Sequence, residues 1–269
     1  FQKSLDLAVK LGLLNKNVAK QVGNVKKQKK KIDFWTQKEF EKVISTFDIS
    51  DYYEHYTFII IWLLFMTGLR LGEAQALEWT DINFEDKTLT VSKSMYYKSA
   101  NEFYVTEPKT RAGNRTIALD DVTISYLAEW KSVQGRNVVS KYVLSYNGLP
   151  TNKSTTKHII ERHSKLAGVH TIKTHALRHS HASLLISLGE NAIVVRDRLG
   201  HEDVETTLGT YGHLYPNTNI EVAKKLNNLI SVKKDDTITR NFISNQFVKN
   251  RQSGCNNISL DCEEKEWDS

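Results

Sequence analysis

Hydrophobic and polar positions divide the chain into a short amphipathic stretch, a polar break and a long region of mixed helical and extended patterns. In the first stretch, apolar side chains recur at Leu5, Val9 and Leu13, and leucines at positions 7, 11 and 14 widen the stripe. This spacing predicts one amphipathic helix over residues 5–14. Because a single helix cannot bury its own apolar face, we expect its packing partners to lie upstream of Phe1.

A basic segment separates this stretch from the rest of the chain. Residues 17–34 show no hydrophobic periodicity and contain five lysines within six positions, which predicts an extended linker. Two interpretations stay open, a solvated hinge and a segment that lies along a phosphate backbone. The lysines are Lys26, Lys27, Lys29, Lys30 and Lys31.

The pattern of a folded domain begins at residue 35. Thr36, followed three residues later by Glu39, forms a capping box, which marks the start of a helix. The longest apolar run, residues 58–66, is too short for a membrane-spanning helix, which needs about 20 residues, so it predicts a buried helix. Gly68 is placed to end that helix, and residues 71–77 form the next one.

Extended segments and further helices complete this domain. A hairpin is predicted over 82–91 with its turn at 85–87, and two more short strands, 103–105 and 116–118, flank the segment 108–114. The fold class expected is mixed, mainly α with a small antiparallel β-sheet, in a domain over residues 35–231. Residues 232–269 are polar and predict a loosely attached tail. The remaining helices are predicted at 121–133, 155–167, 175–188, 192–199, 204–211 and 218–229.

The distribution of charge favours a polyanionic partner. The chain carries a net charge of +6, of which its last fifteen residues contribute −4, so the remainder carries +10. Nucleic acid is the commonest partner of such a basic body, and a merely soluble basic surface is the alternative. The two cysteines, Cys255 and Cys262, both lie in the tail. They predict neither a disulfide framework nor a zinc site, and they are typical of a cytosolic setting.

Arginine and histidine form the first two clusters that could carry chemistry. Arg70 stands between Gly68 and Gly72 at a helix junction, where its guanidinium can present a bidentate fork to a phosphate. A surface arginine beside a helix-ending glycine is the simpler alternative. His175 and Arg178 lie one turn apart on one helix face, so they can offer a proton carrier and a fixed cation to one phosphate.

Metal binding is a competing interpretation of the second cluster. His175 and His179 are four residues apart, a spacing that suits two metal ligands on a helix. A zinc-protease helix has Glu directly after the first histidine, and this chain has Ala176 there. Metal binding is therefore the weaker interpretation.

Two further clusters gain weight only in combination with the others. Leu199-Gly200-His201 is followed by Tyr211, and Lys109 lies in the segment between two predicted strands. A single tyrosine is usually a core residue and a single lysine is usually a surface residue. Neither would be selected alone.

Taken in order, the spaced residues resemble the tyrosine recombinase (phage integrase) family. The resemblance extends from about Thr36 to Leu229 and rests on three patterns, Thr-Gly-Leu-Arg-x-Gly-Glu, His-x-Leu-Arg-His-(Ser/Thr)-x-Ala and Leu-Gly-His-x(9)-Tyr. It is most similar in character to integrases of phages and mobile elements of Gram-positive bacteria. The residues that carry it are Arg70, Lys109, His175, Arg178, His201 and Tyr211.

The resemblance implies a reaction that cuts and rejoins DNA without metal or cofactor. Arg70 and Arg178 would clamp the scissile phosphate, and His201 would hydrogen-bond its oxygens. His175 would be the general base or a phosphate ligand, and Lys109 would protonate the departing 5′-oxygen. Tyr211 would attack and form a 3′-phosphotyrosine, with Tyr215 as the local competitor. Glu73 would steady the site without taking part directly.

The resemblance also implies the architecture and the partners. Residues 1–16 would be the C-terminal remnant of a core-binding (SAM-like) domain, joined by the basic linker 17–34 to a catalytic domain with the family's fold. The expected partners are double-stranded DNA at attachment sites, further copies in a tetramer on DNA, and accessory DNA-bending proteins, in the bacterial cytosol and with no membrane. Two alternatives stay open, a type IB topoisomerase-like enzyme that relaxes DNA and a non-catalytic DNA-binding relative.

Overall fold

The computed structural model describes residues 2–22, 32–98, 102–108, 110–215 and 219–227, and the structural statements below concern these residues. The lysines at 26–31, Lys109 and the tail from residue 228 lie outside them. The chain divides into two units, residues 1–215 and 216–269. In the second unit, α11 (Asn219–Leu226) is the described element.

The N-terminal segment forms two short helices, α1 (Gln2–Lys10) and α2 (Val18–Val22). The prediction of one helix that continues to residue 14 is wrong. Gly12 has a positive φ of 72°, which ends the helical path, and the leucines at 11, 13 and 14 are exposed beyond the end of α1. The sequence pattern also gave no indication of α2. Asn17 links the two helices, since its Nδ2 donates to the Gln2 carbonyl at 3.1 Å.

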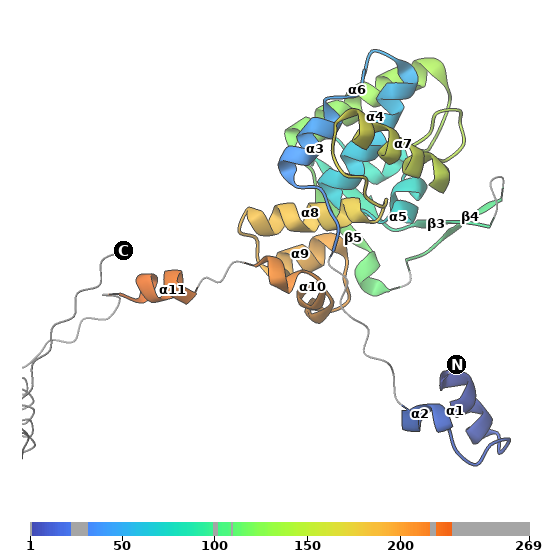
Figure 1. Cartoon of the computed structure of the whole chain (residues 1–269). Coiled ribbons are helices and arrows are strands. Elements are labelled where there is room, and N and C mark those ends of the chain that lie inside the picture. Colours follow the sequence, from blue (N-terminus) through green and yellow to red (C-terminus); the bar gives the residue numbers. More distant parts are fainter. Residues whose placement is uncertain (1, 23–31, 99–101, 109, 216–218, 228–269) are drawn as a thin grey trace, which may run out of the picture. The chain divides into compact units, whose positions relative to one another are not determined.

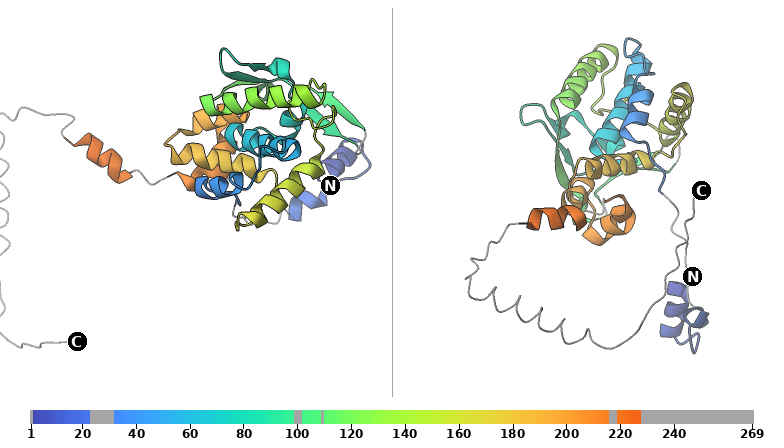
Figure 2. Two further views of the ribbon diagram at one scale, coloured as in Figure 1. Left: turned by 90° about the horizontal axis from the view of Figure 1, so that it is seen from above. Right: turned by 60° about the vertical axis from the view of Figure 1, so that its left-hand side comes forward.

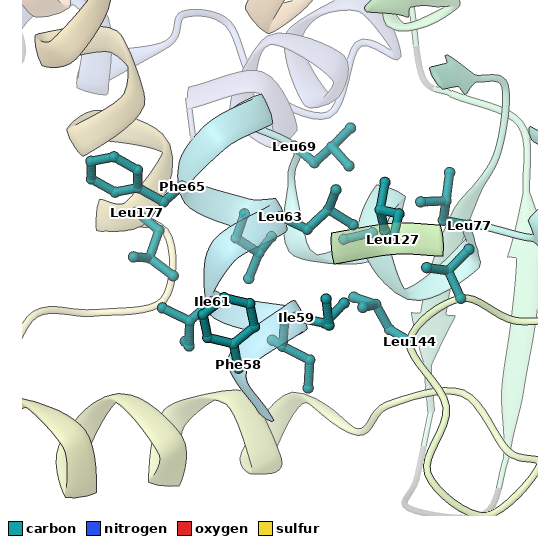
Figure 3. Close-up of a cluster of buried hydrophobic side chains, with 14 of the residues drawn as sticks. Phe58, Ile59, Ile61, Leu63, Phe65, Leu69, Leu77, Leu127, Leu144 and Leu177 are labelled. Carbon is teal, nitrogen blue, oxygen red and sulfur yellow. The ribbon is translucent and has the colours of Figure 1, made fainter. Parts of the chain in front are cut away.

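A mostly buried helix, α4 (Tyr52–Thr67), is the centre of the larger unit. Eleven of its 16 residues are buried, on all sides of the helix, as expected for a helix surrounded by protein. Figure 3 shows its side chains, among them Phe58, Ile61 and Phe65, interleaved with leucines from other elements. Asp51 caps its first turn, and the helix begins at Tyr52, six residues before the apolar run of 58–66. The helices that pack on α4 are α3 (Gln37–Ile44), α5 (Leu71–Ala76), α6 (Asp121–Asn137), α7 (Lys153–Leu166) and α8 (Ala176–Ser187).

The described strands form two small antiparallel sheets, not one. The predicted hairpin is confirmed, with Lys87 at φ 51° in its turn, and its second strand also pairs with the strand near residue 116, with Leu89 opposite Ile117. The strand near residue 103 belongs to a separate pair, whose partner strand was not predicted. The first sheet contains β1 (Ile82–Asn83), β2 (Thr88–Val91) and β5 (Arg115–Ala118), and the second contains β3 (Ser94–Tyr97) and β4 (Phe103–Thr106).

Three consecutive helices form a second packed layer. The structure confirms α9 (Ala192–Leu199) and α10 (Val204–Tyr211) with the predicted bounds. As Figures 1 and 2 show, α8 lies between α4 and α9, and α9 in turn contacts α10 and β5. Their buried side chains form a small separate core that includes Tyr211. Among the described residues, no helix combines the length and the apolar character needed to cross a membrane.

Candidate active site

Two tight turns form the frame of the site. One follows α4 at Gly68 and the other follows α9 at Gly200, and both glycines have a left-handed backbone, with φ of 66° and 69°. Arg178, on α8 and only 2 % exposed, donates from Nη1 to the Gly68 carbonyl at 2.8 Å and from Nη2 to the Leu199 carbonyl at 2.7 Å. This buried arginine therefore holds the ends of two helices together that are distant in sequence.

Arg70 lies just after the first turn and contacts the second one. It caps the N-terminus of α5, and its Nη2 donates to the Gly200 carbonyl at 3.1 Å. Its side chain is 41 % exposed, so a ligand can reach it directly. Burial, together with the charge of Arg70, lowers the pKa of Arg178 to about 9, which leaves Arg178 charged at neutral pH. An anion placed between the two guanidinium groups would be attracted by both.

A buried carboxylate balances these charges. Glu73 is 4 % exposed and pairs with Arg70 Nη1 at 2.7 Å and with Arg115 Nη2 at 2.8 Å. Burial alone would raise the pKa of Glu73, but the hydrogen bonds and charge of Arg115, with those of Arg70, hold it below its ordinary value. Arg115, on β5, also donates from Nε to the Arg198 carbonyl at 2.9 Å. It therefore joins the first sheet to the end of α9.

His201 directly follows Gly200 and faces the same frame. Its Nδ1 lies 2.8 Å from Thr207 Oγ1 on α10. Burial, together with the charges of Arg178 and Arg70, lowers the pKa of His201 to about 4, so the ring is neutral at pH 7. With Nδ1 engaged by Thr207, Nε2 is the ring atom that can bond to a phosphate oxygen.

Tyr211, at the end of α10, is nearly enclosed. It is 1 % exposed, and its hydroxyl lies 2.7 Å from Nδ1 of His179 on α8. Burial raises the pKa of Tyr211 to about 12, against the opposing effect of the Arg178 charge, and burial lowers the pKa of His179 to about 4. The His179 ring also meets His175 edge to face, with centroids 4.9 Å apart. The side chains of His175, His179 and Tyr211 therefore form a continuous row of contacts from α8 to α10.

The structure brings most of the residues expected from the sequence into one region. Arg70, Arg178 and His201 meet at the two glycine turns, and Tyr211 reaches α8 through His179. Lys109 lies outside the described residues. The segment just beyond it is described and approaches the site at Gly200. A Cβ added to Gly200 would lie 2.7 Å from the Ala112 carbonyl oxygen. The described part of the chain contains no group of three or more His, Cys, Asp or Glu side chains placed to hold a metal ion.

Two residues of the site were not selected from the sequence. His179 was considered only as a metal ligand, although its place one turn after His175 put it on the same helix face. Arg115 gave no signal, because its importance depends on Glu73, 42 residues earlier in the chain. Only the tertiary structure shows that this strand residue holds the buried carboxylate.

Residues 33–218 match the model of the phage integrase family, which covers more than half of the chain. The chain belongs to this family. The ICEBs1 integrase of Bacillus subtilis (strain 168) is 35 % identical over 238 residues, which cover 86 % of this chain and 64 % of that integrase. Transposase A from transposon Tn554 of Staphylococcus aureus is 31 % identical over 158 residues, covering 58 % of this chain and 43 % of the transposase. The chain thus spans less than two thirds of either protein, and both confirm the resemblance to integrases of Gram-positive elements.

Solved structures of phage integrase relatives share the fold. The Tn1549 transposon integrase in complex with transposon right end DNA matches with a TM-score of 0.68 at 20 % identity, over 86 % of this chain and 76 % of that one. A lambda integrase dimer bound to a core site matches with a TM-score of 0.54 at 18 % identity, over 76 % and 70 % of the two chains. These matches confirm the predicted fold class, that of the tyrosine recombinase catalytic domain.

Proposed function

We propose that this chain cuts and rejoins double-stranded DNA at specific sites through a covalent 3′-phosphotyrosyl intermediate at Tyr211, and so integrates or excises a mobile element. The observation that carries the proposal is the meeting of Arg70, Arg178 and His201 at two glycine turns, with Tyr211 on the adjacent helix. Family membership supports it, as do the relatives named as integrases and a transposase.

The two arginines stabilise the phosphate on which the tyrosine acts. Arg70 is accessible and binds the phosphate first, and Arg178 adds charge from a buried position, where the lower dielectric strengthens the attraction. His201 donates a hydrogen bond to a phosphate oxygen, and His175 contacts the same group from the start of α8. Fixed cations of this kind stabilise the negative charge of a five-coordinate transition state.

Lys109 is the general acid in this proposal. The 5′-oxygen that leaves the phosphorus needs a proton, and a lysine ammonium group can supply it. Support comes from the close approach of the Ala112 carbonyl to Gly200, three residues beyond Lys109 in the chain. Tyr211, with a pKa of about 12, would need about 7 kcal/mol to ionise at pH 7, so it also requires a proton acceptor and nearby cations.

DNA contacts extend from the site along α7. A hollow of about 790 Å³ borders His175, and its lining includes Lys153, Lys157, Lys173, Ser154 and Thr174, with Glu161 paired to Lys157 at 3.5 Å. Lysines and hydroxyls of this kind bind phosphate oxygens of the DNA backbone without reading its sequence. The hollow is therefore a path for the duplex on one side of the scissile phosphate.

The proposed organisation of the whole protein follows the sequence-based expectations. Residues 1–16 belong to a core-binding domain, the lysines at 26–31 bind the DNA backbone between the domains, and residues 35–231 form the catalytic domain. Four copies assemble on two attachment sites, aided by DNA-bending proteins, in the bacterial cytosol. The chemistry requires no metal ion, because Arg70 and Arg178 supply the positive charge.

A nicked suicide substrate tests the proposal, since loss of the short strand after cleavage traps the covalent adduct. The unchanged chain and Tyr215→Phe are expected to form the adduct, and Tyr211→Phe is expected to form none. Denaturing gel electrophoresis of labelled DNA measures it, and mass spectrometry of the linked peptide locates the tyrosine. An adduct on Tyr211→Phe that is lost on Tyr215→Phe would contradict the assignment. Relaxation of supercoils without exchange between two DNA sites would favour a topoisomerase-like activity instead.

A further inference from the structure

The hydrogen-bond partner of the Tyr211 hydroxyl is His179, a residue to which the family resemblance gave no part in the reaction. We propose that His179 is the proton acceptor for Tyr211 when the tyrosine attacks DNA, an inference that rests on the proposed function. The distance between His179 Nδ1 and the Tyr211 hydroxyl is 2.7 Å, within the range of a direct hydrogen bond. A proton acceptor has to be this close to the proton that it removes.

The chemistry of the pair determines which atom donates. Burial, with the positive charge of Arg178 and the ring of His175, keeps His179 neutral at pH 7. A neutral imidazole has one nitrogen that accepts and one that donates, and a phenol is a stronger acid than an imidazole N–H. Tyr211 therefore donates to Nδ1 of His179, which leaves the His179 proton on Nε2.

His175, the histidine expected to act as base, is placed differently. It lies at the start of α8 and is exposed, whereas His179 is half-buried one turn further on, between His175 and Tyr211. An exposed position suits a residue that contacts the DNA phosphate. The half-buried position suits a residue that serves the nucleophile, so the two histidines divide the tasks that the sequence assigned to His175.

Cleavage forms one bond to phosphorus and breaks another, with one proton transferred at each oxygen. The Tyr211 oxygen forms a bond to phosphorus while its proton passes to Nδ1 of His179. The bond from phosphorus to the 5′-oxygen breaks, and this oxygen takes a proton from the general acid proposed above, Lys109. In rejoining, the free 5′-hydroxyl attacks the phosphotyrosine and returns its proton to Lys109, while the proton on His179 returns to the departing Tyr211 oxygen. No oxidant, metal ion or further reactant is needed.

The burial of Tyr211 is compatible with this role. The small core around it includes Leu214 and Tyr215, which come from the segment directly after the tyrosine. A shift of that segment, which includes η3 (Gly212–Leu214), would expose the hydroxyl to DNA, and His179 would stay in place on α8. The negative charge of an incoming phosphate then favours the protonated form of His179, against the effects of Arg178 and His175.

The test uses His179→Asn, because the Asn side-chain oxygen can replace Nδ1 as hydrogen-bond acceptor but cannot take up a proton at neutral pH. We expect single-turnover cleavage to fall by on the order of 10²-fold. A fluorinated tyrosine of lower pKa at position 211 should restore most of the lost rate in His179→Asn, since its proton is easier to remove. His181→Asn, a buried neighbour on α8, is the control for destabilisation, and its rate should not respond to the fluorinated residue.

A second substrate separates proton removal from proton donation. A 5′-bridging phosphorothiolate has a leaving group that needs no proton, so it should rescue Lys109→Ala and leave His179→Asn slow. Three results would overturn the inference: a His179→Asn rate within twofold of that of the unchanged chain, a deficit that the fluorinated tyrosine does not reduce, or rescue of His179→Asn by the phosphorothiolate. If the unchanged chain forms no adduct at all, the proposed function itself fails.

Discussion

At the scale of single residues, the charges of the site are arranged around one buried carboxylate. Glu73 lies between Arg70 and Arg115, and Arg115 is only 7 % exposed. A buried ion pair contributes little net stability relative to apolar packing, yet loss of one partner leaves an uncompensated charge and costs about 3–5 kcal/mol. Glu73 therefore supports both the stability of the fold and the position of Arg70.

We predict that Glu73→Gln lowers the free energy of unfolding by about 3 kcal/mol at pH 7, because Arg115 loses its counter-charge inside the protein. Chemical denaturation monitored by circular dichroism measures this change. Glu102→Gln, which breaks an exposed pair with Lys98, is the matched control and should alter stability little. An equal loss in both variants would show that burial of the carboxylate is unimportant.

We predict that the loss of stability in Glu73→Gln depends on pH. The folded state lowers the pKa of Glu73 below the unfolded value, so the stabilisation is complete above the unfolded pKa, about 4.5, and is lost as pH falls through the lower folded pKa. The stability difference between the unchanged chain and Glu73→Gln should therefore be constant near neutrality and shrink in acid. Denaturation curves between pH 7 and pH 3 measure this difference in stability. A difference that grows in acid would contradict the prediction.

At the scale of elements, the site depends on how helices end. Gly200 ends α9 with a left-handed backbone, and a Cβ there would lie 2.7 Å from the Ala112 carbonyl oxygen and 2.8 Å from Arg115 Nη1. The Ala112 oxygen belongs to the backbone, and Arg115 is tied to Glu73 and to the Arg198 carbonyl, so neither neighbour can move freely. The turn that receives Arg70 and Arg178 therefore has space for glycine alone.

We predict that Gly200→Ala abolishes adduct formation and destabilises the fold by more than the roughly 1–2 kcal/mol that a left-handed backbone costs a non-glycine residue. Gly189→Ala is the matched control, since Gly189 also has a positive φ, 89°, but has no atom within 4 Å of an added Cβ. It should show the backbone cost alone and keep its activity. Thermal unfolding and the suicide-substrate assay measure the two effects, and equal behaviour of the two variants would contradict the role of the contact at Gly200.

Local signals in the sequence predicted the elements that such signals control. The capping box at Thr36 and the bounds of α9 and α10 are confirmed, because caps and helix-ending glycines act within a few residues. The end of α1 was wrong because the leucines beyond Gly12 continued the helical spacing after the backbone had turned. β3 was not predicted, although it pairs at short range with β4, with Tyr97 opposite Phe103.

The site was predictable only as far as the motifs extend. Arg70, Arg178, His201 and Tyr211 follow from family patterns, and the structure brings them into one region. The contact between His179 and Tyr211 joins residues 32 positions apart, and that between Glu73 and Arg115 joins residues 42 apart. Such contacts depend on tertiary packing, in which α9 contacts α8, α10 and β5, and no spacing along the chain specifies it.

At the scale of the whole molecule, the positive charge is the property that matters for DNA. The sequence-based assignment placed DNA contacts in the lysines at 26–31, which lie outside the described residues. The structure adds a second region, the hollow along α7, which borders His175 and whose lining contains three lysines and Glu161. In the proposed function, its lysines would hold the duplex while the scissile phosphate lies between the arginines.

We predict that the double variant Lys153→Gln with Lys157→Gln weakens DNA binding and reduces the dependence of affinity on salt. Each phosphate contact contributes about 0.9 to the slope of log K against log salt concentration, so loss of two contacts should lower the slope by about 2. Lys38→Gln with Lys42→Gln is the matched control, because it removes the same charge from the exposed side of α3. Fluorescence anisotropy with a duplex at several salt concentrations measures both variants. At saturating DNA, the α7 variant should still form the Tyr211 adduct, since its lysines bind DNA and do not take part in the reaction. If the α3 control lowers the slope as much as the α7 variant, the change in slope is caused by net charge alone, and the hollow is not the path of the DNA.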